Sequence, residues 1–178
     1  MSEKNTLEQL NIARASGDDL AKHNALLAHA NALLLSNLHI EAGIILDEAV
    51  EMHAKAKRSV DEAHCLHLAA TAYRFGKSLD EAENRAKKAV TIAPSNTPIA
   101  VSSWTELGET VLSKGRSLEA AQHYQTALER AVNKFRQRSS NSVEESYGFL
   151  ELRENQTQYV LPAEVINVSR IYRRTVGG

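Results

Sequence analysis

The sequence has little of what builds disulfide-rich, membrane or nucleic-acid-binding proteins. Its 178 residues include one cysteine, Cys65, which excludes an internal disulfide. Lys and Arg number 21 against 22 Asp and Glu, so the net charge of -1 offers no basic surface for nucleic acid or anionic lipid. The longest apolar stretch, residues 26–35, is interrupted by His29 and Asn31 and is too short to cross a bilayer. We therefore expect no nucleic-acid and no membrane partner.

The start of the chain is polar and carries no apolar segment of the kind found in secretory signals. A single cysteine is compatible with a reducing compartment. These features favour a cytoplasmic protein. A hydrophobic content of 43% is sufficient for one core, with one folded unit and a tail.

Capping residues and apolar periodicity predict helices over residues 6 to 138. Helix starts are predicted at Thr6, Asp18, Ser59, Ser78 and Pro98. Another helix is expected from about Ile40 to Lys57, after a short turn. Gly76 is expected to close the helix that begins at Ser59.

The most specific pattern lies between Val101 and Val132. It reads Trp104-x2-Leu107-Gly108-x2-Val111, then Gly115, then Ala120-x3-Tyr124-x2-Ala127. These spacings indicate two amphipathic helices joined by a tight turn, with bulky residues meeting small ones where the helices cross. We expect Trp104 to be buried by the second helix near Ala120 and Tyr124.

This pattern resembles the tetratricopeptide repeat, from which it departs at Val111, where the family has Tyr, and at Val132, where it often has Pro. Two weaker copies precede it by 38 and by a further 40 residues, against roughly 34 in the family. The second copy comprises Leu66, Ala69, Ala70, Tyr73, Ala82, Ala86, Ala89 and Pro94. The first comprises Leu26, His29, Ala30, Leu33, Ala42, Leu46 and Ala49.

The resemblance implies an all-α fold, a right-handed α-solenoid of antiparallel helix hairpins. The helical domain would span residues 1–138, with an N-terminal helix and three repeats at about 20–57, 60–94 and 98–138. Residues 139–178 would form a C-terminal capping segment or arm. Within it, the sequence predicts a linker at 139–142, β-prone runs at 147–152 and 157–161, and a short helix after Pro162.

The resemblance also implies a concave groove, formed by the first helix of each repeat, that binds a protein or peptide partner. The matching positions in the first repeat are Asn24, Leu27, Asn31 and Leu34. Those in the second are His64, His67, Thr71 and Arg74. Those in the third are Ser102, Thr105, Glu109 and Leu112.

No combination of residues predicts catalysis or a bound metal. Residues 76–78, Gly-Lys-Ser, match the end of a phosphate-binding loop, but the earlier glycine and the incoming strand are missing. Residues 64–67, His-Cys-Leu-His, lack the further ligands of a closed metal site nearby in sequence. Glu106 and Glu109 share a helix face and are interpreted as solvated carboxylates. We therefore expect no enzyme, no catalytic residue, no metal and no cofactor.

The leading hypothesis is a non-catalytic interaction module or adaptor that holds a peptide or a partner helix in its groove. One alternative is a secretion-type chaperone, because small three-repeat proteins with an N-terminal helix resemble the chaperones that keep aggregation-prone secreted clients soluble. Another is a self-associating structural repeat protein whose end faces stack into homo-oligomers.

Overall fold

A computed structural model describes residues 3–146 of the chain, and within these the side chains of residues 3–133. This part of the chain forms seven α-helices and no β-strand. The helices are α1 (Glu3–Ser16), α2 (Asp19–Leu35), α3 (His39–Lys55), α4 (Ser59–Phe75), α5 (Leu79–Ile92), α6 (Pro98–Ser113) and α7 (Ser117–Ser146). The prediction of an all-α fold is confirmed for these residues.

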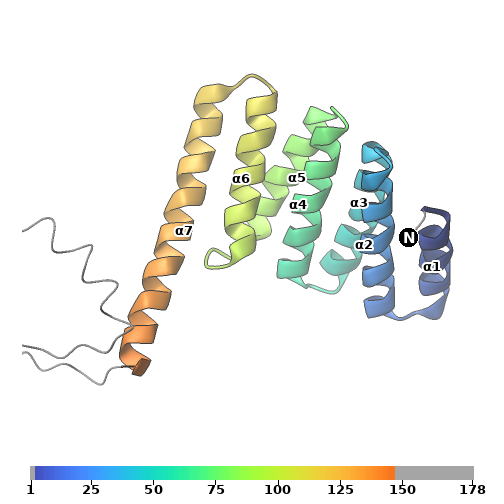
Figure 1. Cartoon of the computed structure of the whole chain (residues 1–178), viewed down its shortest axis with the longest axis horizontal. Coiled ribbons are helices and arrows are strands. Elements are labelled where there is room, and N and C mark those ends of the chain that lie inside the picture. The colour runs from blue at the N-terminus through green and yellow to red at the C-terminus, as the bar shows by residue number, and fades with distance from the viewer. Residues whose placement is uncertain (1–2, 147–178) are drawn as a thin grey trace, which may run out of the picture. The chain divides into compact units, whose positions relative to one another are not determined.

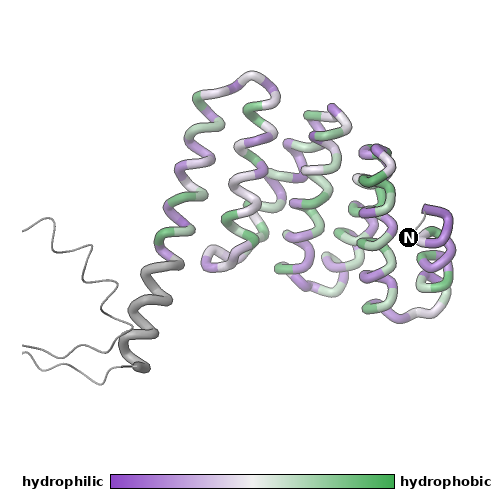
Figure 2. Tube along the Cα trace, viewed as in Figure 1, coloured by the Kyte–Doolittle hydropathy of each residue, from purple (hydrophilic) through white to green (hydrophobic). Residues whose placement is uncertain are grey.

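Each helix from α1 to α5 packs against the next one along the chain, and α4 also packs against α6. Consecutive helices run in opposite directions in Figure 1. Hydrophobic and hydrophilic residues alternate along the coloured part of each helix in Figure 2, as expected where one face of a helix is buried. None of the described helices is long and apolar enough to cross a membrane.

The same turn geometry joins most of these helices. One residue in each turn has a positive φ, and in chain order these residues are Gly17, Asn37, Lys57, Lys77 and Gly115. After the last four of them, a backbone N–H bonds back to a carbonyl five residues earlier: Leu38 to Leu33, Arg58 to His53, Ser78 to Tyr73 and Arg116 to Val111. This Schellman arrangement satisfies carbonyls that the helix end would otherwise leave without partners. From 17 to 77 the turns recur every 20 residues, so helix and turn form one repeating unit.

The glycine before one of these turns serves packing rather than backbone freedom. Gly76 has a φ of -72°, whereas the positive φ belongs to Lys77. A Cβ added at Gly76 would lie 2.6 Å from Cδ1 of Ile40. Gly76 does close α4, as predicted, and α3 approaches it closely.

Small residues fill the seams between helices. One buried cluster joins α2 to α5 and consists of Ala30, Leu33, Ala42, Leu46, Ala69, Ala72, Tyr73 and Ala82. A second joins α4 to α7 and consists of Ala70, Ala86, Leu107, Val111 and Ala120, with Val90, Trp104 and Tyr124 packed against it. Because alanine adds little volume, the helix backbones can approach one another closely.

The predicted burial of Trp104 near Ala120 and Tyr124 is only partial. Trp104 is half-buried, and its ring lies tilted against that of His123 with the ring centroids 5.5 Å apart. The ring against Gly108 is that of Tyr124, whose Cε1 lies 2.7 Å from the position of an added Cβ. Tyr73 stands in the same relation to Gly43 at the α3–α4 seam.

Four of the predicted helix starts are confirmed, at Asp18, Ser59, Ser78 and Pro98, and one is wrong. Asp18 caps α2 by accepting hydrogen bonds from the N–H groups of Leu20 and Ala21, and Pro98 lies in the first turn of α6. The helices α4 and α5 begin at Ser59 and directly after Ser78, but neither serine makes the predicted capping hydrogen bond. Both follow a Schellman turn in which ψ before the helix is near 70 to 77°, away from the extended values that favour a side-chain cap.

The predicted helix start at Thr6 is wrong, because α1 already begins at Glu3. The Thr6 hydroxyl donates to the carbonyl oxygen of Glu3 and lies 2.9 Å from Nδ1 of His29. It therefore connects α1 to α2 inside the protein instead of capping α1.

The predicted linker at residues 139–142 is wrong, because α7 continues through it to Ser146. No proline or glycine occurs between Ser117 and Ser146, so nothing in the sequence breaks the helix. The β-prone runs at 147–152 and 157–161 and the helix after Pro162 lie outside the described residues. The contacts within the chain separate residues 1–139 from residues 140–178.

The glycine–tyrosine seam yields a stability prediction at Gly43. Glycine-to-alanine substitution within a helix ordinarily stabilises it by up to about 1 kcal/mol. Here the new Cβ would lie 2.8 Å from the Tyr73 ring, so we expect Gly43→Ala to lower the free energy of unfolding by about 1–3 kcal/mol. Denaturant unfolding measures the effect, with the exposed substitution Glu41→Ala on the same helix as control. An increase in stability for Gly43→Ala would contradict this packing.

Candidate partner-binding face

The predicted groove residues lie on α2, α4 and α6, the first helices of the three hairpins. Exposed members are Asn24, Asn31, His64, Thr105 and Leu112. Half-buried members are Leu27, Leu34, His67, Thr71, Arg74, Ser102 and Glu109. Leu27 and Leu34 also pack against the buried cluster that joins α2 to α5. Apolar and polar groups therefore both contribute to this set of residues.

Two of the predicted residues on α4 meet a residue of α6 that the pattern did not assign to the groove. The guanidinium of Arg74 binds the carboxylate of Glu106 through two hydrogen bonds, Nε to Oε1 at 2.7 Å and the second nitrogen to Oε2 at 3.1 Å. The hydroxyl of Thr71 lies 2.8 Å from Oε2, and that of Thr110 lies 3.2 Å from Oε1. The carboxylate is thus contacted from both α4 and α6.

Glu106 is 5% exposed, so its interpretation as a solvated carboxylate is wrong. Its neighbours Leu107 and Thr110 are also buried, because α4 covers this side of α6. Hydrogen bonding to Glu106 raises the pKa of Arg74, which keeps the guanidinium charged. The buried role of Glu106 follows from its contact with Arg74 on α4. The spacing of residues along α6 alone does not indicate it.

Other polar side chains at or near the groove differ in burial and in charge. Burial lowers the pKa of His67, so this imidazole is neutral at physiological pH. His64 is exposed. Burial and the neighbouring Glu109 raise the pKa of Tyr124 to about 12, so the phenol keeps its proton. Among the described residues, no hydrogen bond or ion pair joins the α2 positions to those of α4 or α6.

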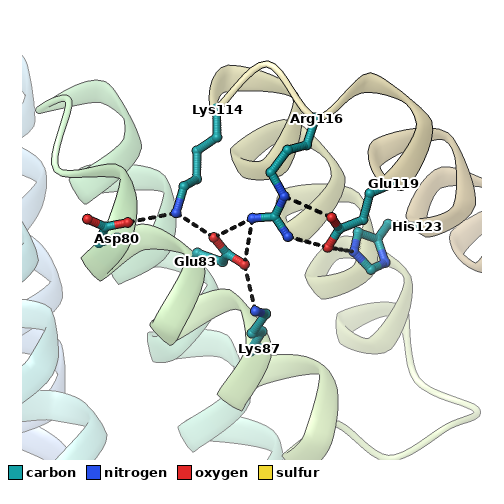
Figure 3. Close-up of polar contacts among 7 residues, drawn as sticks. All are labelled: Asp80, Glu83, Lys87, Lys114, Arg116, Glu119 and His123. Carbon is teal, nitrogen blue, oxygen red and sulfur yellow. Dashed lines mark hydrogen bonds and ion pairs between the residues drawn. The ribbon is translucent and has the colours of Figure 1, made fainter.

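A second polar cluster, on α5 and the α6–α7 turn, holds the last hairpin in place (Figure 3). Lys114 and Arg116, which flank Gly115 in that turn, both bind Glu83 of α5, at 2.7 and 2.9 Å. Lys87 binds the other oxygen of Glu83 at 2.6 Å. Arg116 continues to Glu119, and Lys114 to Asp80. Glu83 is the only one of these acids that is buried.

Comparison with protein-family models finds no match for this chain, and comparison with curated protein sequences finds no relative. Any proposal of a repeat family or of a function therefore depends on the residues themselves and on their arrangement.

The Glu83 cluster predicts how stability depends on pH. Burial alone would raise the pKa of Glu83, but the hydrogen bonds from Lys114, Lys87 and Arg116 outweigh it and lower the pKa from 4.5 to about 2. The resulting stabilisation, about 2–4 kcal/mol, is present above pH 4.5 and is lost as the pH falls toward 2. We expect Glu83→Gln to lose that amount at pH 7 and to approach the wild type near pH 2.

Denaturant unfolding over this pH range measures the difference, with Glu51→Gln, on an exposed position of α3, as the control that should stay within about 0.5 kcal/mol at every pH. If the difference between Glu83→Gln and the wild type does not change between pH 7 and 2, the bound cations do not depress this pKa.

Proposed function

We propose that this chain is a non-catalytic protein-binding module of the tetratricopeptide-repeat type, with α2–α3, α4–α5 and α6–α7 as its three hairpins. The supporting observation is the direct packing of α4 on α6, with Thr71 and Arg74 meeting Glu106 at the seam. Packing between the first helices of successive hairpins, seen here for α4 and α6, is the arrangement in which stacked repeats form a groove.

The groove surface would suit an extended peptide or an amphipathic helix. Leu27, Leu34 and Leu112 provide apolar contacts, and His64 and Thr105 provide exposed polar groups between them. Because Glu106 neutralises the charge of Arg74, this side chain contributes packing and ordered hydrogen bonds to the groove rather than a free positive charge. Specificity then depends on shape and on the exposed polar positions.

Two other functions are supported by particular features. The helix α1 packs on α2, giving the N-terminal helix that a secretion-type chaperone of this size would have. Leu118 and Leu128 on α7 are 80% and 64% exposed, which favours self-association through the last hairpin. Each of these functions predicts a different partner or a different contact surface.

Site-specific photo-cross-linking in the native cell distinguishes them. A photoreactive residue is placed at exposed groove positions 31, 64 and 105, and at exposed control positions 41, 51 and 84 on α3 and α5. We expect one partner to cross-link from the groove positions and not from the controls. Cross-links mainly between copies of this chain, or equal yields from the controls, would contradict the proposal.

Once that partner is purified, a bulky substitution tests the groove directly. We expect His64→Trp to weaken binding at least tenfold, about 1.4 kcal/mol, since it fills space on the α4 face. Asn84→Trp, at an exposed position of α5, should leave the affinity unchanged. Circular dichroism of both variants shows whether the fold is kept.

A further inference from the structure

Three side chains that can bind metal ions meet between α2, α3 and α4. They are His23 of α2, His53 of α3 and Cys65 of α4, and their ligand atoms all lie within 4.8 Å of one another. Nε2 of His53 is 2.9 Å from Nδ1 of His23, and the two rings meet edge to face with centroids 4.7 Å apart. Three separate helices therefore direct two imidazoles and a thiol toward one point.

The spacing fits a tetrahedral ion. Zn²⁺ binds His nitrogen at about 2.0–2.1 Å and Cys sulfur at about 2.3 Å, which places neighbouring ligand atoms about 3.3–3.8 Å apart. The 2.9 Å between the two imidazole nitrogens needs to open by only a few tenths of an ångström. Imidazole and thiolate together are a donor set that suits zinc and excludes calcium and magnesium.

The surroundings are those of a partly enclosed site. Cys65 is fully buried and packs with Leu10, Leu26 and Ala49. His53 is 1% exposed, whereas His23 is half-buried. Protein therefore surrounds two of the ligands, and the third leaves access for a fourth ligand such as water.

The nitrogen of His53 that faces away from His23 lies near a carboxylate. Nδ1 is buried and has no hydrogen-bond partner within the described part of the chain, and Oδ2 of Asp61 lies 3.9 Å from it. A carboxylate behind a ligating histidine orients the ring and makes it a better donor. Asp61 is half exposed and can move the short distance needed.

The protonation states are compatible with such a site. Burial and the adjacent His23 lower the pKa of His53, which keeps its imidazole neutral and able to bind a metal. Burial and Asp61 raise the pKa of Cys65 to about 12, so binding must displace the thiol proton. Asp61 and Asp19 provide negative charge near His53, and Arg58 opposes them.

We propose that His23, His53 and Cys65 bind a Zn²⁺ ion that joins α2, α3 and α4. The ion would hold the first hairpin to the second. Among the described residues, no charged pair between these two hairpins is as buried as the Arg74–Glu106 pair. The proposed site contains none of the predicted groove residues, and it shares only Cys65 with the His64–His67 segment that the sequence draws attention to. His64 is exposed, and neither of those histidines belongs to the cluster.

Cobalt substitution tests the site on the full-length chain, prepared without a histidine tag and stripped of metal. We expect one equivalent of Co²⁺ to give the ligand-field bands of a tetrahedral ion and a sulfur-to-cobalt charge-transfer band. Zn²⁺ should displace the cobalt and raise the melting temperature. Absence of the charge-transfer band, or an unchanged melting temperature with Zn²⁺, would overturn the proposal.

Variants identify the ligands. We expect His23→Gln and Cys65→Ala each to weaken Zn²⁺ binding at least tenfold, and Cys65→Ala to remove the charge-transfer band. His64→Gln, one residue before Cys65 on the same helix, should bind like the wild type. If the buried Cys65→Ala variant does not fold, the half-buried His23→Gln variant still decides the question. Equal losses in His23→Gln and His64→Gln would place the ion elsewhere and contradict the assignment.

Discussion

The candidate binding face depends on the hydrogen-bonded pair of the buried Glu106 carboxylate and the Arg74 guanidinium. Burial of an ion is costly unless its hydrogen-bonding capacity is met. Here two guanidinium nitrogens and two threonine hydroxyls lie within hydrogen-bonding distance of it. A displacement of α4 along α6 would leave the charge without partners, so the pair fixes the register of the second and third hairpins.

Acids that bind cations of other helices also join the remaining helices. Asp47 of α3 receives two hydrogen bonds from Arg85 of α5 and one from the Tyr73 hydroxyl of α4. Glu83 of α5 binds the basic residues that flank the α6–α7 turn. Alanine-rich seams allow close packing but do not fix the position of one helix along another, because small apolar surfaces can slide past one another. The acids and their cationic partners on neighbouring helices fix these relative positions, because charged hydrogen bonds depend on geometry.

Sequence periodicity was sufficient for the helices but not for their contacts. Caps, small residues and Pro98 predicted an all-α chain with short turns, because those signals act within a few residues. Lys57 and Lys77 take a positive φ without the expected glycine, since the Schellman bonds and the closely packed helices determine the turn. Glu106 appeared solvated, and His23 was not linked to His53 and Cys65, because each relation joins residues 12 or more positions apart on different helices. Such relations follow from packing, which local patterns do not encode.

A double-mutant cycle between Arg74 and Glu106 tests the central claim most directly. The variants are Arg74→Met, Glu106→Gln and the double substitution, and the measured quantity is the coupling free energy of unfolding. The buried, bidentate geometry predicts a coupling of about 2 kcal/mol or more, several times that of an exposed pair. A coupling below about 0.5 kcal/mol would show that this pair does not join α4 to α6, and the proposed binding face would lose its structural basis.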